Sequence, residues 1–218
     1  MIPQPGTRDR RDLRLVLAGL IVPLGLMFCA ALLVVRQNGK PVWKLLGDPT
    51  AVLHANPLLG FFSNLGILGW CAGASVALFA AAVLAGRQAD RAIVRFYRIA
   101  GAFTALLMVD DFFLIHDDLA WRYLRLPQNA VYAVYGIFFA VFVARCRREL
   151  LARNPALFAL AVGLLGFMAG IDTVAGGTSK MVSFAMCGSK LLGIFTWSAW
   201  LVLNARNDLA GAGPGASR

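Results

Sequence analysis

The sequence predicts an all-α fold: a polytopic membrane protein with six transmembrane helices in one bundle. Of its 218 residues, 59% are hydrophobic and only 15% are charged, and the mean hydropathy is +0.70. A soluble domain is about 45–50% apolar and about one quarter charged. Several apolar runs also reach the roughly 20 residues that a membrane-spanning helix needs. These observations leave no room for a sizeable soluble domain.

Six apolar runs define the expected helices, at residues 13–35, 60–86, 96–116, 129–146, 156–175 and 181–204. Prolines, glycines and asparagines separate them, as in Asn38-Gly39-Lys40-Pro41 and Asn154-Pro155. The first run is too long for a signal peptide and lacks a small-residue cleavage site, so we expect it to remain as a helix. Residues 1–12 form a basic cytoplasmic N-terminus, and residues 205–218, which end in a Gly-, Ala- and Pro-rich stretch, form a tail that we expect to be disordered.

The distribution of Lys and Arg predicts the orientation. Fourteen lie at the N-terminus, in the second and fourth connections and in the tail, against six in the other connections, and Lys190 lies within a run. Cytoplasmic loops carry the excess of positive charge, so both termini are expected in the cytoplasm of a bacterial inner-membrane protein. The net charge of +10 therefore indicates topology, and we expect no nucleic-acid partner.

Other function classes lack their signatures. The four cysteines fall in or at the end of apolar runs with no paired spacing, which argues against disulfides and a cysteine zinc cluster. The chain has no phosphate-binding glycine loop, no Gly-x-Ser-x-Gly and no His-Glu-x-x-His. The paired Asp-rich loops of isoprenoid transferases and the arginine- and histidine-bearing signature of membrane lipid phosphatases are also missing.

The stretch LLMVDDFFLIHDDLAW, residues 106–121, holds four of the eleven acidic residues within nine positions. A charged side chain at the centre of a membrane costs about 2.5–3.5 kcal/mol, so such residues face the bundle interior or a wet cavity and have partners. In the expected topology this cluster lies near the outer face. Four further polar residues share that depth, namely Ser63, Asn64, Asp172 and Lys190.

Helical spacing divides the acidic cluster. At about 100° per residue, Thr104, Asp111 and Asp118 share one strip of the third helix, with Asp110 and Asp117 on the neighbouring strip. In a regular helix His116 projects away from Asp110. Its participation therefore requires a break or unwinding near Ile115.

Three roles fit this set of residues. Asp110, Asp111, His116 and Asp117 could bind a divalent cation: carboxylates suit magnesium or manganese, and a histidine would admit zinc or iron. Crowded carboxylates could instead exchange a proton, for acid–base catalysis or for proton-coupled transport. An Asp172–Lys190 pair could simply join two helices, and Asp117 and Asp118 could be a solvated cap balanced by Arg122 and Arg125.

Other conspicuous residues have structural interpretations. Gly69-Gly73 and Gly166-Gly170 have the small-residue spacing that permits close helix packing. Several tryptophans lie at predicted membrane interfaces, the set being Trp43, Trp70, Trp121, Trp197 and Trp200. His54 lies in the first outer connection, as a loop residue or an additional member of the site.

Three segments resemble a family of uncharacterised bacterial membrane proteins. They are Ser63-Asn64-Leu65-Gly66, the Asp110-Asp111 to His116-Asp117 stretch, and Lys190-Leu191-Leu192-Gly193, in that order. The resemblance extends from about Asp48 to Asn204 and implies a multi-span architecture without an assigned activity. Members carry acidic residues just before the lysine segment, where this chain has Met186 and Cys187, so a metal site would not extend to the sixth helix.

The chain is also loosely similar to the alkaline ceramidase-like membrane hydrolases. These enzymes use a zinc ion bound by several histidines, beside serine and aspartate residues. Ser63, Asp110 or Asp111, and His116 match that pattern, but His54 is the only other histidine. Two histidines cannot form a three-histidine site, so the similarity serves as an analogy only.

The leading hypothesis is a membrane-embedded enzyme, a hydrolase or lipid-modifying enzyme, acting on a lipid or isoprenoid-like substrate from the outer leaflet. Asp110, Asp111, His116 and Lys190 would be catalytic, and Ser63, Asn64 and Asp172 would bind substrate. The alternatives are a small proton- or ion-coupled transporter and a structural or accessory subunit. Against the transporter, the chain has no internal repeat, which many transporters have.

Overall fold

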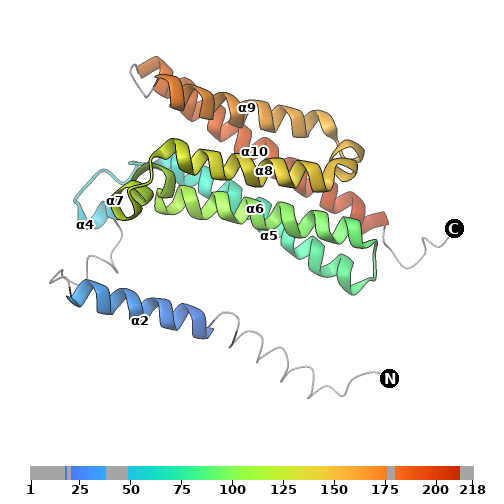
Figure 1. The fold of residues 1–218 in the computed structure, drawn as a ribbon, viewed down its shortest axis with the longest axis horizontal. Helices are drawn as coiled ribbons and strands as arrows, with labels where there is room; N and C mark the ends of the chain where they lie inside the picture. Colours follow the sequence, from blue (N-terminus) through green and yellow to red (C-terminus); the bar gives the residue numbers. More distant parts are fainter. Residues whose placement is uncertain (1–17, 19–20, 38–48, 176–179, 212–218) are drawn as a thin grey trace. The chain divides into compact units, whose positions relative to one another are not determined.

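The computed structural model describes residues 18, 21–37, 49–175 and 180–211, and the regular secondary structure of this part is entirely helical (Figure 1). The chain divides into two compact units, Met1–Leu59 and Gly60–Arg218. The first unit contains α2 (Val22–Gln37) and α4 (Pro49–Val52).

The second unit is built from five long helices. They are α5 (Phe61–Gly86), α6 (Arg91–Phe113), α8 (Gln128–Ala152), α9 (Pro155–Ala175) and α10 (Lys180–Gly211). Each is long and apolar enough to cross a membrane, which suggests a membrane-embedded protein. They correspond to the last five predicted spans. The first predicted span falls on α2, and residues 19–20 and 38–48 on either side of this helix lie outside the described part.

The segment between α6 and α8 departs most from the prediction. The third helix was expected to run through 116, but α6 ends at Phe113, and Leu114 has the left-handed backbone φ of 51°. A π-helical turn, η2 (Ile115–Leu119), and a short helix, α7 (Ala120–Leu124), follow. The left-handed conformation costs a non-glycine residue about 1–2 kcal/mol, and it reorients the chain that follows.

Two of the predicted glycine positions pack closely against a neighbouring helix. A Cβ added to Gly69 would lie 2.9 Å from Ile194 Cγ2 of α10, and one added to Gly73 would lie 2.7 Å from Ser198 Oγ. The packing role predicted for this pair is confirmed. The same prediction for Gly166 and Gly170 is wrong, because an added Cβ would meet nothing within 4 Å at either position.

Three tryptophans belong to the core. Trp70, Trp197 and Trp200 are buried, and each indole N–H donates a hydrogen bond, to Asp111 Oδ2, Thr104 Oγ1 and the Arg153 carbonyl respectively. Trp121 is exposed, and Trp43 lies outside the described residues. The bundle thus uses aromatic N–H groups to satisfy polar atoms that would otherwise be buried without partners.

The expected disordered tail begins as helix. α10 continues seven residues beyond the predicted end at 204 and stops at Gly211, while residues 212–218 lie outside the description. Asp208 accepts hydrogen bonds from Arg153 Nε (2.7 Å) and Tyr97 Oη (2.7 Å), and Arg87 donates to the Leu209 carbonyl. These contacts hold the last turns of α10 against the bundle.

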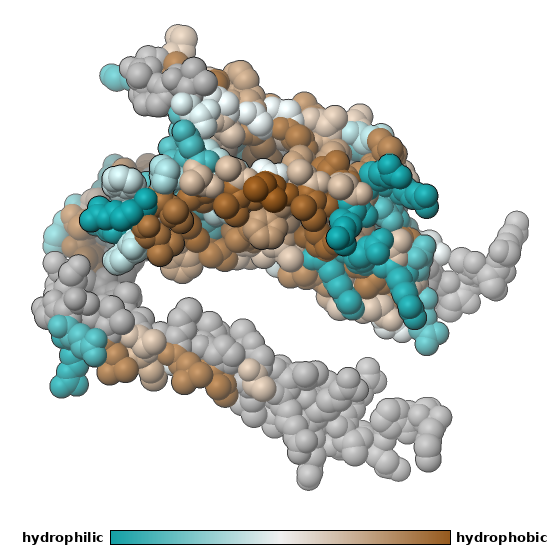
Figure 2. All heavy atoms as spheres, in the orientation of Figure 1, coloured by the Kyte–Doolittle hydropathy of each residue, from teal (hydrophilic) through white to brown (hydrophobic). Residues whose placement is uncertain are grey.

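Hydrophilic residues gather at the end of the bundle where α5 and α8 end (Figure 2). Six arginines there are exposed: Arg91, Arg95, Arg98, Arg145, Arg147 and Arg148. They belong to the two connections that the sequence assigns to the cytoplasmic side. The acidic cluster lies at the other end of α6.

Candidate functional site

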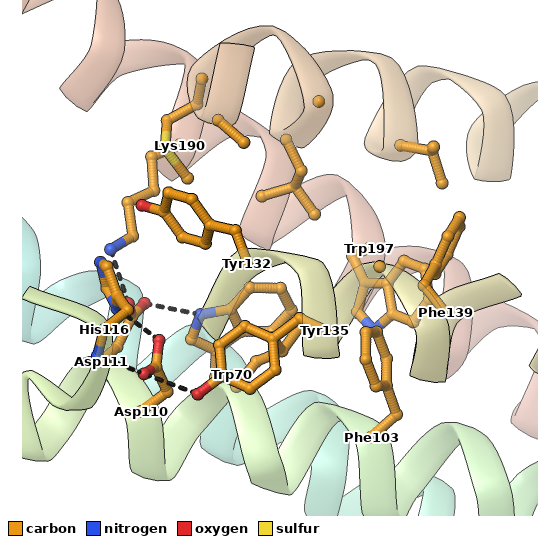
Figure 3. A pocket seen from close by; sticks show the side chains of 17 residues that line it. Trp70, Phe103, Asp110, Asp111, His116, Tyr132, Tyr135, Phe139, Lys190 and Trp197 are labelled. Carbon is orange, nitrogen blue, oxygen red and sulfur yellow. Dashed lines mark hydrogen bonds and ion pairs between the residues drawn. The ribbon is translucent and has the colours of Figure 1, made fainter. Parts of the chain in front are cut away.

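A cavity of about 290 Å³ lies in the second unit, walled by α5, α6, α8, α9 and α10. Its lining is mainly apolar, but the polar side chains are confined to one end. There Asp110, Asp111, His116 and Lys190 converge, whereas Phe103, Phe139 and Trp197 enclose the other end (Figure 3). A volume near 300 Å³ is at the lower limit of small-molecule pockets.

The broken helix brings His116 to Asp110. His116 Nδ1 lies 2.5 Å from Asp110 Oδ2, and the His116 backbone N–H donates to Asp110 Oδ1 at 2.9 Å. Tyr135 Oη donates to the same Oδ1 at 2.8 Å. In a continuous helix the imidazole would point away from Asp110, so the left-handed Leu114 creates this contact.

The other imidazole nitrogen also faces a carboxylate. His116 Nε2 lies 3.3 Å from Asp117 Oδ1, and His116 is buried whereas Asp117 is half exposed. Burial disfavours the charged imidazole, but the hydrogen bond and negative charge of Asp110, together with the charge of Asp117, outweigh it and raise the pKa of His116 above its usual value. The histidine is therefore suited to carrying a proton near neutral pH.

Asp111 is held by two donors from distant parts of the chain. Lys190 Nζ of α10 lies 2.6 Å from Asp111 Oδ1, and Trp70 Nε1 of α5 lies 2.9 Å from Oδ2. The carboxylate is buried, while the lysine is about one third exposed. Lys190 and the acidic cluster of α6 therefore meet, with Asp111 as the partner of the lysine.

Asp172 has other partners. Its Oδ2 accepts hydrogen bonds from Tyr132 Oη and Gln128 Nε2, both at 2.7 Å. Gln128 also donates to Asp117, at 3.2 Å. Among the described residues Asp172 and Lys190 form no ion pair, so the proposed staple between these two is wrong. Lys190 instead forms its ion pair with Asp111 of α6.

The remaining predicted residues lie around the site. Ser63 lines a smaller cavity of about 130 Å³ that shares Lys190 with the main one, whereas Asn64 is exposed and lines neither. Asp118 forms the predicted surface pair with Arg122, at 3.0 Å. His54 lies in a turn of the first unit, after α4.

Four residues of the polar end were not anticipated: Trp70, Gln128, Tyr132 and Tyr135. The last three occur at helical spacing on α8, which places them on one face toward the site. That spacing was the available signal. It was weak, because tyrosines near the start of a helix are also common at a membrane interface.

The same end could in principle hold a metal ion. One ligand atom from each of Asp110, Asp111 and His116 can be chosen so that all three lie within 4.8 Å of one another. However, Asp111 already carries the Lys190 ammonium group, and both oxygens of Asp110 accept hydrogen bonds. A cation would have to displace Lys190, so the donor set fits proton chemistry better than metal binding.

The fold and site together define an all-helical bundle with a buried His–Asp pair and a Lys–Asp pair beside an apolar cavity. The chain matches the family described as "Domain of unknown function (DUF8692)" over residues 10–203, and it belongs to that family. No curated protein and no solved structure matches it.

Proposed function

We propose that the protein is a membrane-embedded enzyme that performs acid–base chemistry on a lipid. The observation that carries the proposal is the His116–Asp110 pair, which lies on the wall of an apolar cavity instead of being packed between helices. Buried titratable groups that border a cavity and have specific charged partners are typical of catalytic sites.

Each polar residue has a role in this proposal. Tyr135 holds Asp110, and Asp110 fixes the imidazole through Nδ1. The other nitrogen, Nε2, faces the half-exposed Asp117 at 3.3 Å and carries the proton for transfer. Lys190 and Trp70 fix Asp111, and Lys190 also contributes a positive charge at the cavity wall. Asp172 orients Tyr132, which borders the substrate. A metal-dependent variant of the reaction is less well supported, because Lys190 occupies Asp111.

The location of the site supports access from the outer leaflet of a bacterial inner membrane. Five helices have the length and hydropathy of spans, and the exposed arginines lie at the end of α6 opposite the acidic cluster. Under the excess of positive charge on cytoplasmic loops, the arginine end is cytoplasmic, both termini included, and the site is near the periplasmic side.

The proposal is tested by exposing membrane lipids to the purified full-length protein. Wild type, Asp110→Asn and Gly163→Leu are each incubated with lipid vesicles made from a total bacterial lipid extract, and the lipids are compared by mass spectrometry. We expect a lipid that is consumed by wild type and Gly163→Leu but not by Asp110→Asn. Lipid profiles that are unchanged with wild type, or equally changed with Asp110→Asn, would overturn the proposal.

A further inference from the structure

The cavity is open on one side, between α8 and α9. Gly136 of α8 and Gly166 of α9 both line it and are both exposed, so they form its rim. An added Cβ at either position would meet nothing within 4 Å. Around this opening the surface is apolar, with Ile137, Phe138 and Phe167 more than half exposed. In a membrane, such a mouth faces lipid tails and not water.

The polarity of the cavity lining changes along the direction of the helix axes. From Asp110 to Phe103 on α6, and from Lys190 to Trp197 on α10, the lining changes from charged to aromatic over seven residues, which is about 10 Å of helix. An amphiphile with one polar end and one apolar end matches this gradient (Figure 3). A cavity of about 290 Å³ is at the lower limit of small-molecule pockets, which favours part of a single hydrocarbon chain over two chains side by side.

The charge at the polar end restricts the head group. Asp110 and Asp111 line the cavity, and Asp117 and Asp172 lie just outside it, in contact with the lining residues His116 and Tyr132. Among the described residues, the positive groups paired with these four carboxylates are Lys190 and, when protonated, His116. The formal charge of the whole group is therefore negative in either protonation state of the histidine. A phosphate or carboxylate head group would add like charge within a few ångströms, which is unfavourable in a poorly solvated site. An ammonium or hydroxyl head group can instead donate hydrogen bonds to the second lone pairs of the carboxylate oxygens, without displacing the donors already present.

We infer that the site binds a single-chain amphiphile with a cationic or uncharged, hydrogen-bond-donating head group, whose chain enters sideways between α8 and α9. This inference rests on the proposed lipid-directed function and specifies its substrate class. The hydrocarbon chain gains little on leaving the bilayer, since both environments are apolar, so the head group sets the selectivity and the glycine rim provides passage.

The test uses photoreactive probes with the same hexadecyl chain and different head groups: a primary amine, an alcohol, a carboxylate and a phosphate monoester. Each probe carries a diazirine in the chain and is crosslinked to the full-length protein in detergent, and the labelled residues are mapped by mass spectrometry. We expect the amine and alcohol to label cavity residues of α8 and α9 at least tenfold more than the phosphate probe does. Equal labelling by all four, or preference for the anions, would overturn the inference.

Variants of the rim test the route. Gly166→Leu and Gly136→Leu should each reduce amine-probe labelling of the cavity about tenfold, because the new side chain narrows the mouth. Gly163→Leu is the matched control: it lies on α9 with nothing within 4 Å of an added Cβ, but it does not line the cavity, and its labelling should equal wild type. Unreduced labelling in both rim variants, with unchanged melting temperatures, would contradict lateral entry.

Failure of this inference is distinguishable from failure of the proposed function. Selective labelling without turnover of any lipid would leave the binding site intact and overturn only the catalytic proposal. Turnover that depends on Asp110, combined with labelling that ignores the head group and the rim, would overturn only the substrate class.

Discussion

Two ion pairs join helices in this bundle, and they differ in their surroundings. Lys190 of α10 pairs with Asp111 of α6, and eighteen residues later, about 27 Å along the same helix, Asp208 pairs with Arg153. Both pairs are partly shielded from solvent. Both carboxylates have a second donor, from Trp70 in the first case and Tyr97 in the second.

The Arg153–Asp208 cluster is closed by packing. The guanidinium of Arg153 lies over the Phe96 ring at 5.5 Å, and the Arg153 carbonyl accepts the Trp200 N–H. Neither charged side chain borders the cavity described above, whereas the Asp111–Lys190 pair forms part of its wall. A buried ion pair alone therefore indicates a structural contact between helices, whereas an ion pair that borders a cavity indicates a functional site.

The largest expected effect is the loss of catalysis when a carboxylate that borders the cavity is neutralised. Asp110→Asn should lower turnover of the lipid substrate by about 100-fold or more, because the imidazole loses the carboxylate that orients it. The melting temperature should change little, since the amide has the same shape and His116, unlike an arginine, can remain neutral once its carboxylate partner is removed. Turnover is measured by mass spectrometry, and unfolding by differential scanning fluorimetry in detergent. A variant that turns over lipid normally would show that the His116–Asp110 pair is structural and not catalytic.

The converse is expected for Asp208→Asn. Removing this charge leaves Arg153 without its partner and should lower the free energy of unfolding by about 2 kcal/mol. Turnover by the folded protein should equal wild type. Denaturant unfolding in detergent gives the first quantity. A loss of activity without a loss of stability would show that the Arg153–Asp208 pair takes part in function.

The Asp111–Lys190 pair is also expected to control metal binding at the site. Wild-type protein should contain no stoichiometric divalent metal after purification, because the Lys190 ammonium group occupies Asp111. Lys190→Met frees that carboxylate beside Asp110 and His116 and should bind added Zn²⁺ at least tenfold more tightly than wild type does. Calorimetric titration measures this affinity. Stoichiometric metal in wild type that disappears in Asp110→Asn would establish a metal enzyme.

A smaller effect is expected at the break in α6. Leu114→Gly should raise the free energy of unfolding by about 0.5–1 kcal/mol, because glycine adopts the left-handed conformation without strain and Leu114 is half exposed. Leu124→Gly, also at an exposed leucine but within α7, should lower it by a similar amount. Equal destabilisation by both substitutions would argue against a strained Leu114.

The smallest expected effect concerns pH. Folding raises the pKa of His116 above its ordinary value of 6.5. Protonation of His116 therefore stabilises the folded state fully at pH values below 6.5, and this stabilisation is lost as the pH rises through the folded-state pKa. The melting temperature of wild type should therefore fall relative to His116→Gln as the pH increases above 6.5. Parallel melting curves for the two proteins across that range would contradict the assignment.

The sequence predicted the bundle better than the site. Apolar runs located five long helices because membrane spans must be long and apolar, and the cost of burying charge indicated that Asp110, Asp111 and Lys190 would meet. It also indicated that His116 requires a break in the helix near Ile115. Nothing in the sequence specified that the break would be a left-handed Leu114, since leucine seldom adopts that conformation.

The pairings were harder to predict because each depends on which carboxylate comes within reach. Asp172 and Lys190 were candidates for each other, but Gln128 and Tyr132 on α8 satisfy Asp172 instead. Gly166 has the spacing of a packing glycine and yet faces open space. Local pattern does not distinguish a helix face that meets a neighbour from one that borders a cavity.

The π-helical turn after Leu114 makes the contact between His116 and Asp110 depend on the number of residues in this segment. The backbone N–H of Leu119 donates to the carbonyl of Leu114 five positions earlier, so the turn holds one residue more than an α-helical turn. If loss of a single residue between Asp110 and His116 restored an uninterrupted helix, the imidazole would follow Asp110 by five positions and lie about 140° away from it around the helix axis. A one-residue deletion at this point would therefore separate the histidine from the aspartate.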